Sequence, residues 1–362
     1  MSCQRRSAVG WITAVAVVIG AVSYLLSLPV GILAMVTSPD LGVHLTSLNG
    51  SLAIEAFLLI FPTPLQVNVF PIVIIALLIF GICFAKAATS NGGFRSGIRI
   101  LLTGSRPRTL PNWLAVMPLL ASSLFVIIIL LTLIQSSAGV STGNLMCPTS
   151  TPNCKADLFA SIITAPVAEE FGFRISVLGL VVAILVARRL MGPTPQGPSL
   201  KSSQKIGTFF SSFISPGYAK ERAGLPSVRT GGMKGISISE WIFLAFTASV
   251  FGLYHVIGGG GWGPGKFLTA ALSGFVLGLV YLAYGAFADI LLHWFFNFYF
   301  EVYIVSTPFD GVLMPIGLLN ALGCIALGVW GIIIAIKWLA QKNLAPVLSQ
   351  TVGPAVPPTP AC

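Results

Sequence analysis

Three charged residues lie close together in a stretch of the sequence that is otherwise apolar. Glu169 and Glu170 are adjacent and Arg174 follows four residues later, and the run Leu158–Ala187 holds no other charge. Each charged side chain costs about 2.5–3.5 kcal/mol at the centre of a membrane helix unless it is paired or protonated. An ion pair that closes a helical bundle is the structural explanation, and a buried carboxylate that performs acid–base chemistry is the functional one. Because this cost is high, it favours the functional explanation.

Two of the three histidines also lie in apolar helical stretches. His255 closes the segment SVFGLYH, and His293 is followed four residues later by Asn297, on the same helical face. A lone buried histidine is more often structural, but two of them beside paired glutamates favour a site. His44 falls in a polar loop, and we expect no role for it. The stripe of His293 extends at four-residue spacing to Asp289 and Glu301.

Helix geometry gives these side chains different tasks. Glu170 and Arg174 are one turn apart, so they can pair and keep Glu170 ionised. Glu169 points about 100° away and is left as a proton acceptor. Histidines nearby could orient a water molecule, and the Asn297 amide could donate to a developing oxyanion.

Composition places the chain in a membrane. Of its 362 residues, 55% are hydrophobic and 8% are charged, against about 25% charged residues in soluble domains. The net charge of +10 does not indicate nucleic-acid binding, because the basic residues lie in loops between apolar runs. The six cysteines show no zinc-ligand spacing. Cys147 and Cys154 share a loop and could form a structural disulfide if that loop faces an oxidising compartment.

Apolar runs of about 20 residues predict an all-α fold, a polytopic transmembrane helical bundle with about eight spans. The first run is too long for a signal peptide, so we expect an uncleaved helix. A shorter apolar piece near Ser51–Phe61 contains Glu55 and should lie at the interface or re-enter the membrane. Leu158–Ala187 is longer than a span requires, which predicts tilt, a break near Gly172 or extension into water. The expected spans are Val9–Val36, Leu65–Ala85, Trp113–Ile134, Leu158–Ala187, Ser239–Ile257, Phe267–Tyr284, Ala286–Ile304 and Val312–Trp338.

The distribution of basic residues predicts the orientation. Of the 20 lysines and arginines, all lie on one side except Lys155 and Lys266 on the opposite side and Arg174 within the bilayer. The positive-inside rule then predicts that both termini are cytoplasmic, in the plasma membrane of a prokaryote. The basic, Gly/Ser/Pro-rich segment 192–238 should be a mobile cytoplasmic loop that contacts anionic lipid. The tail 343–362 should be disordered, and its terminal Cys362 lacks the residues that a prenylation signal needs.

Together the polar residues form three motifs, each on a separate apolar helix. EEFGFR matches EExxxR, Phe251–His255 matches FxxxH, and His293–Asn297 matches HxxxN, in that order. This set resembles the CAAX prenyl endopeptidase and bacteriocin-processing family of intramembrane proteases, also called the CPBP or Abi family. The resemblance covers residues 155–305 as the protease core. Residues 1–150, expected as N-terminal helices with a basic loop, and the last helix within 306–342 lie outside it.

The resemblance implies a water-accessible cavity inside the bundle and a role for each motif residue. Glu169 would activate the attacking water with help from His255, and His293 and Asn297 would stabilise the oxyanion. Glu170 and Arg174 would support the site. Members of the family have been described as metalloproteases and as metal-independent glutamate proteases. We expect no cofactor; if zinc is bound, its ligands would be Glu169, His255 and His293.

The leading hypothesis is therefore an endopeptidase that hydrolyses a peptide bond near a membrane-embedded substrate terminus, with CAAX-type processing as one form. Its partners would be the bilayer and a membrane-anchored or prenylated peptide or protein, with no nucleic acid. A proton-coupled transporter could instead use the two glutamates and two histidines as a relay, although the chain shows no internal repeat. A third hypothesis is a non-catalytic immunity or scaffold protein. Convergence of the polar residues on one cavity would favour catalysis, and dispersal along a pore would favour transport.

Overall fold

Helices make up most of the computed structural model, which describes residues 8–37, 39–104, 110–143, 154–192, 198, 200–258, 261–305 and 310–351. The elements that belong to the bundle are α1 (Ala8–Thr37), α3 (Val69–Thr89), α5 (Trp113–Ser137), α6 (Cys154–Glu170), η1 (Phe171–Leu178), α7 (Gly179–Met191), α11 (Ile238–Ile257), α12 (Lys266–Tyr284), α13 (Ala286–Trp294), η3 (Phe295–Tyr299), α14 (Glu301–Val305) and α15 (Asp310–Thr351). The elements between them are α2 (Pro39–Ser47), β1 (Asn49–Ala56), β2 (Leu59–Asn68), α4 (Gly93–Thr103), α8 (Ser202–Ile214), α9 (Pro216–Arg222), α10 (Val228–Gly231) and η2 (Gly232–Gly235).

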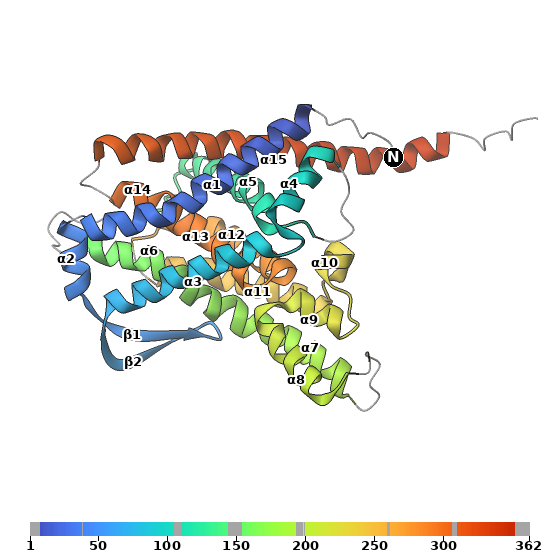
Figure 1. Cartoon of the computed structure of the whole chain (residues 1–362), viewed down its shortest axis with the longest axis horizontal. Coiled ribbons are helices and arrows are strands. Elements are labelled where there is room, and N and C mark those ends of the chain that lie inside the picture. The colour runs from blue at the N-terminus through green and yellow to red at the C-terminus, as the bar shows by residue number, and fades with distance from the viewer. Residues whose placement is uncertain are drawn as a thin grey trace, which may run out of the picture.

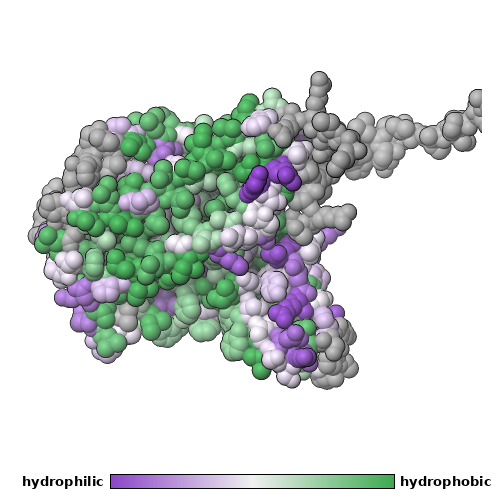
Figure 2. Space-filling model, in the orientation of Figure 1, coloured by the Kyte–Doolittle hydropathy of each residue, from purple (hydrophilic) through white to green (hydrophobic). Residues whose placement is uncertain are grey.

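Seven helices of the described residues are long and apolar enough to cross a membrane. They run alongside one another (Figure 1), and apolar side chains cover the face formed by α1, α3 and α15 (Figure 2). This confirms the multi-pass helical bundle. The eighth expected span, Ala286–Ile304, is interrupted by a turn at Phe300 between η3 and α14, so it is not among the seven.

Side-chain caps define where several helices begin. Asn68 accepts a hydrogen bond from the Phe70 amide at the start of α3, and Asn112 accepts one from the Leu114 amide at the start of α5. Asn112 is fully buried and also donates to the carbonyl oxygens of Ala87 and Ser90. It therefore fixes the end of α3 against the start of α5, because each cap satisfies backbone groups that the helix leaves unpaired.

The segment expected as a mobile loop, 192–238, instead contains the packed helices α8, α9 and α10. It forms the hydrophilic region at the lower right of Figure 2, beside α7. Lys220 of α9 is 4% exposed and donates to both carboxylate oxygens of Glu240, at 2.9 and 2.6 Å. Glu240 in turn completes a capping box with Ser237 at the start of α11. Breaking such a buried pair is costly, so this segment is anchored to the bundle.

The apolar piece near Ser51–Phe61 forms a β-hairpin, which was not expected in an all-helical chain. β1 and β2 pair antiparallel and meet at the turn residues Phe57 and Leu58. The hairpin lies along the lower side of the bundle, near the end distant from α8–α10 (Figure 1). Its turn reaches η1, since the Leu58 amide donates to the Gly172 carbonyl at 3.2 Å. The segment is thus a hairpin that contacts the bundle, and its place at the interface or within the membrane stays a prediction.

The C-terminal tail is helical for part of the range in which we expected disorder, because α15 continues to Thr351. Residues 352–362, with Cys362, lie outside the described residues. Cys154, the first residue of α6, is disulfide-bonded. Its expected partner Cys147 also lies outside the described residues.

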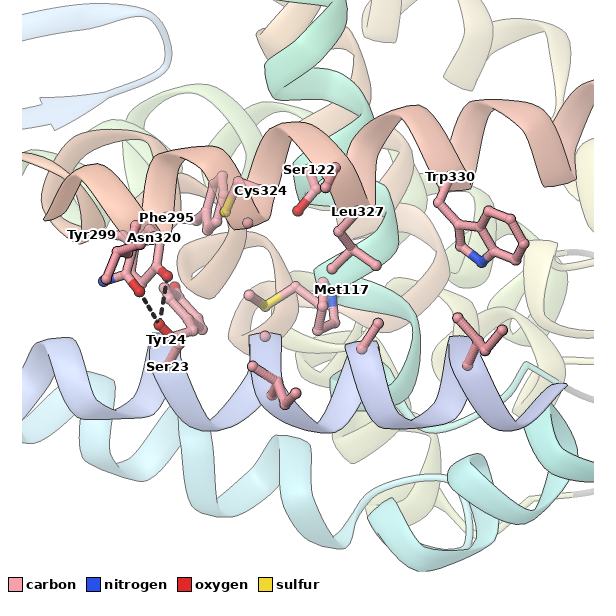
Figure 3. A pocket seen from close by; sticks show the side chains of 18 residues that line it. Ser23, Tyr24, Met117, Ser122, Phe295, Tyr299, Asn320, Cys324, Leu327 and Trp330 are labelled. Carbon is pink, nitrogen blue, oxygen red and sulfur yellow. Dashed lines mark hydrogen bonds between the residues drawn. The ribbon is translucent and has the colours of Figure 1, made fainter. Parts of the chain in front are cut away.

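An apolar cavity of about 430 Å³ lies between α1, α5 and α15 (Figure 3). At one end, the Ser23 hydroxyl hydrogen-bonds to the Tyr299 hydroxyl at 2.7 Å and donates to the Asn320 side-chain oxygen at 2.8 Å. Phe295 and Tyr299 of η3 form one wall of this cavity, while Phe296 and Asn297 of the same π-helix line a second one. η3 therefore separates two cavities.

Candidate active site

The two glutamates end α6, and a π-helix follows them at once. α6, η1 and α7 together form one continuous helical stretch, Cys154–Met191. The break expected near Gly172 is therefore a change of helical winding, because η1 begins at Phe171. π-Turns inside α-helices occur frequently at functional sites, where they reorient side chains.

Arg174 and Glu170 form the ion pair that their spacing predicts. The Arg174 Nη1 atom donates to Glu170 Oε1 at 2.8 Å, and both side chains are fully buried. Arg174 Nη2 donates to the carbonyl oxygen of Gly274 on α12 at 3.2 Å. The guanidinium carbon lies 4.4 Å from the centroid of the Phe251 ring. A cation–π contact and two hydrogen bonds thus compensate a charge that has left water.

His293 joins both glutamates. Its Nδ1 atom lies 2.6 Å from the same Glu170 Oε1 that accepts from Arg174, and its Nε2 atom lies 3.6 Å from Glu169 Oε2. A carboxylate can only accept, so the hydrogen bond to Glu170 places a proton on Nδ1. Glu170 thereby fixes the orientation of the ring, as carboxylates do behind many functional histidines.

His255 and Asn297 line a cavity of about 200 Å³ together with His293. His255 Nδ1 lies 2.9 Å from the Phe251 carbonyl oxygen one turn earlier, and a ring nitrogen can only donate to a carbonyl. The neutral ring then carries its lone pair on Nε2. Glu169 Oε2 is buried and has no hydrogen-bond partner among the described residues. The structure thus brings the three motifs to one place.

Of the two remaining members of the predicted polar stripe, Asp289 stays beside the site and Glu301 does not line the cavity. Asp289 is fully buried and interacts with the side chain of Glu170. Glu301 falls in α14, beyond η3, and is partly buried. The extra residue of the π-helical turn breaks the four-residue register between them. His44 lies in α2 and contributes no group to the cavity.

Two polar residues at the site were not assigned to it from the sequence. Glu55 of β1 packs against Gly172, where an added Cβ would lie 3.0 Å from the Glu55 Cβ. Burial and the charge of Glu169 raise the pKa of Glu55 to about 7, partly offset by His293. Lys266, the first residue of α12, lines the cavity with His255, His293 and Asn297. The sequence signal for Glu55 was a carboxylate inside an apolar segment. The neighbouring residues in the sequence did not show which part of the fold Glu55 would contact.

The proposed zinc ligands do not form a ready metal site. No three His, Cys, Asp or Glu side chains of the described residues are grouped so that they could hold a metal ion. His293 turns Nδ1 to Glu170 and Nε2 toward Glu169, while His255 lines the same cavity and directs Nδ1 to the Phe251 carbonyl oxygen. The expectation that no cofactor is required stays a prediction.

Comparison with known proteins agrees with the motifs. Residues 152–299 match the family model described as type II CAAX prenyl endopeptidase, Rce1-like. This confirms the resemblance inferred from EExxxR, FxxxH and HxxxN, for a segment that runs from α6 to η3. The hairpin, the helices before it and α15 lie outside the match. Neither a comparison with curated proteins nor one with solved structures finds a match.

Proposed function

We propose that this membrane protein is an endopeptidase that hydrolyses a peptide bond near a membrane-embedded substrate terminus, using water activated by Glu169. One observation carries the proposal. The chain Arg174–Glu170–His293 orients a histidine toward Glu169, at the wall of a cavity that His255 and Asn297 also line. Fully buried charges at the meeting point of several helices are costly, and the cost is understandable at a catalytic site.

In the proposed reaction, Glu169 takes a proton from a water molecule whose oxygen attacks the scissile carbonyl carbon. His255 holds that water through its Nε2 lone pair, since Nδ1 is engaged by the Phe251 carbonyl. The tetrahedral intermediate collapses by breaking the C–N bond, and Glu169 returns the proton to the leaving amine. One carboxylate thus serves first as general base and then as general acid.

His293 and Asn297 supply the charge stabilisation. His293, held through Nδ1 by Glu170, and the Asn297 amide lie at the cavity wall, where both would face the oxyanion. Preorganised donors in a site that excludes water are usually the largest single contribution to such catalysis. Glu170 and Arg174 do not touch the substrate in this mechanism; they hold His293 in place.

The proposed substrate is a membrane-anchored peptide or protein. The matched family is named for CAAX prenyl endopeptidases, so a prenylated substrate is the first class to test. The bundle would lie in the plasma membrane of a prokaryote with both termini in the cytoplasm. No metal takes part in the proposed mechanism.

The contacts of both glutamates with His293, which lines a cavity together with His255 and Asn297, favour this function over the alternatives. In a transporter, the ionisable groups would follow a path across the bundle, whereas here Glu169 and Glu170 both contact His293, and Arg174 pairs with Glu170. A non-catalytic scaffold or immunity protein would not need a buried carboxylate oxygen such as Glu169 Oε2, which has no hydrogen-bond partner among the described residues.

Cleavage of a membrane-presented peptide by purified variants tests the proposal. Glu169→Gln should fold normally and lose nearly all activity, because an amide cannot take the proton from water. His255→Ala and His293→Ala should also fall steeply. Asn297→Ala should lose about 10²- to 10³-fold and keep residual turnover, as expected for one oxyanion donor. His44→Ala serves as the control and should be neutral.

Chelation separates the glutamate mechanism from a metal mechanism. Activity should persist in the presence of a chelator. Full activity of Glu169→Gln would refute the role of Glu169. Loss on chelation that added zinc restores would instead make the site a metalloprotease.

A further inference from the structure

A polar pocket lies between the end of α3, the segment α8–α10 and the end of α12. Lys86, Arg229 and Tyr284 are among the residues that line it, and we call it the interfacial pocket. Its volume of about 410 Å³ falls within the range of about 300–1,000 Å³ that is typical of ligand sites. Lys86 lies in the last turn of α3, and Tyr284 is the last residue of α12. Both helices are candidate spans, so the pocket lies where spans end and lipid headgroups begin.

Two cationic side chains from separate elements line the interfacial pocket, and no acidic side chain in the described part of the chain does so. Lys86 is exposed and forms no salt bridge among the described residues. Arg229 of α10 pairs with Glu221 through Nε at 3.3 Å and donates from Nη2 to the Asn91 side-chain oxygen at 3.4 Å. The pocket therefore holds an uncompensated positive charge beside a guanidinium. Ammonium and guanidinium groups are the usual protein partners of phosphate.

Packing holds Arg229 in position without a ligand. A Cβ added to Gly217 of α9 would lie 2.9 Å from Arg229 Cδ, so the arginine stem rests directly on the α9 backbone. The contacts with Glu221 and Asn91 then fix the guanidinium at the end of that stem. A side chain that is already ordered loses less entropy when a ligand binds, which favours binding.

The rest of the wall suits an amphiphilic ligand better than a free anion. The Tyr218 and Tyr284 hydroxyls form no hydrogen bond with the described residues and can donate to a ligand oxygen. The Tyr284 ring packs on Trp113, with the ring centroids 4.8 Å apart. Tyrosines with an apolar ring and a polar end are typical of the headgroup level. Beside these polar groups, the wall includes the apolar side chains of Ile214, Ala283 and Phe287.

We propose that the interfacial pocket binds the phosphate group of an anionic phospholipid, with Lys86 and Arg229 as its main partners. Basic pockets between membrane helices on the cytoplasmic side bind anionic headgroups, and both cations belong to segments that we expect in the cytoplasm. The apolar wall would contact the glycerol and the first acyl carbons. α8–α10 lie within the family match and α3 lies outside it, so the bound lipid would join the protease core to the N-terminal helices. The proposal does not depend on peptidase activity.

Titration with lipids tests the site. The full chain, in an uncharged detergent, is titrated with short-chain phosphatidylglycerol and with phosphatidylcholine of the same chains. Phosphatidylglycerol should bind about 10- to 100-fold more tightly, the range expected for hydrogen bonds to a charged group, because the two cations repel choline. It should also raise the unfolding temperature, since a ligand of the folded state stabilises it. Equal binding of the two lipids would overturn the proposal.

A matched pair of variants separates the pocket from diffuse attraction. Lys86→Met should lose about tenfold or more of the affinity for phosphatidylglycerol. Lys234→Met removes the same charge from an exposed side chain of η2 that does not line the pocket. It should lose no more than about fivefold, the contribution of one cation near an anionic surface. Equal loss in the two variants would overturn the proposal.

A charge-neutral variant assigns the second partner. Glu221→Gln/Arg229→Gln removes the guanidinium and leaves the net charge of the protein unchanged. It should lose about tenfold or more of the affinity, whereas Glu221→Gln alone should keep it. Full affinity of the double variant would refute a site built on Arg229.

Soluble anions identify the source of the phosphate. Inorganic phosphate and glycerol phosphate lack the acyl carbons that would contact the apolar wall, so each should displace phosphatidylglycerol only at about 100-fold higher concentration. Displacement by inorganic phosphate at the concentration of the lipid would show a site for free phosphate and overturn the lipid assignment.

Discussion

Glu170 shows how one carboxylate serves two partners. Its Oε1 atom accepts from Arg174 at 2.8 Å and lies 2.6 Å from His293 Nδ1, with no exposure to solvent. The charge of Arg174 offsets that of Glu170, and Glu170 orients His293. The same oxygen atom thus pairs with Arg174 and orients His293. Removing Arg174 or His293 should show which of the two contacts stabilises the fold.

We predict that Arg174→Ala destabilises the protein far more than Glu169→Gln does. Arg174→Ala leaves Glu170 buried without its cation, and breaking a buried pair costs about 3–5 kcal/mol. Glu169→Gln removes a charge and nearly keeps the shape. Thermal unfolding in detergent measures the difference. The double variant Glu170→Gln/Arg174→Ala should recover part of the loss, and equal stability of the two single variants would contradict the pairing.

Glu55 makes docking of the hairpin dependent on pH. Its pKa is raised from 4.5 to about 7 by burial first and then by Glu169, with His293 acting in the opposite direction. A carboxyl group with a raised pKa binds its proton more tightly when docked, so docking is most favourable at low pH and weakens as pH rises through about 7.

Hydrogen exchange of the hairpin peptide, corrected for intrinsic rates, measures this dependence. Protection should fall between pH 5 and pH 9 in the wild type. Glu55→Gln, which is neutral throughout, should show the same protection at both ends of that range. Protection that increases with pH would show that the carboxylate, and not the acid, is the docked form.

At the scale of elements, the π-helix and the hairpin depend on each other. The Phe57 amide donates to the Ser176 hydroxyl oxygen at 2.9 Å, and the Leu58 amide donates to the Gly172 carbonyl at 3.2 Å. Both turn residues have positive φ, 51° and 65°, which bulky side chains rarely adopt. Contacts with η1 therefore hold a strained turn, as is common where a structure serves function.

Gly172→Ala should displace the hairpin. Its new Cβ would lie 3.0 Å from the Cβ of Glu55, and the strand behind that atom cannot yield as a flexible side chain would. Overpacking of this kind costs about 1–3 kcal/mol. Faster proteolysis or hydrogen exchange at residues 49–68 is the expected result.

Gly81→Ala on α3 is the matched control for this change. An added Cβ there meets nothing within 4 Å, and alanine favours a helix over glycine by about 0.5–1 kcal/mol. This variant should be neutral or slightly stabilised. Equal behaviour of the two variants would mean that the hairpin does not rest on Gly172.

At the scale of the whole molecule, the basic segment and the hairpin lie toward opposite ends of the bundle (Figure 1). The segment with α8–α10 carries Lys201, Lys205, Lys220, Arg222, Arg229 and Lys234. Because positive charge stays in the cytoplasm, the hairpin end and Lys266 should face the other side. The disulfide of Cys154, near that end, agrees with an oxidising compartment.

Cysteine labelling in intact cells tests this orientation. A cysteine placed at Ser203 of α8 should resist an impermeant reagent until the cells are opened. A cysteine at Ser141, before α6, should react in intact cells. The reverse pattern would invert the topology and place the cavity's Lys266 end in the cytoplasm.

The sequence by itself determined the class of the molecule and the motif residues of the candidate site. Apolar runs determine where spans form because the bilayer requires about 20 apolar residues, and charged residues inside such runs are too costly to be accidental. The spacing of Glu170 and Arg174 determined their pairing, since residues four apart share a helical face. The motifs identified the family, which the match of residues 152–299 confirms.

Only the tertiary structure decided what the site contains beyond the motifs. Glu55 and Gly172 are over one hundred positions apart, and no local pattern predicts that a hairpin turn will dock on a π-helix. The same holds for Lys266, which joins His255 and His293 only because α11, α12 and α13 pack together. Side-chain periodicity records which face of a helix is apolar, whereas the partner of that face depends on how all the helices pack.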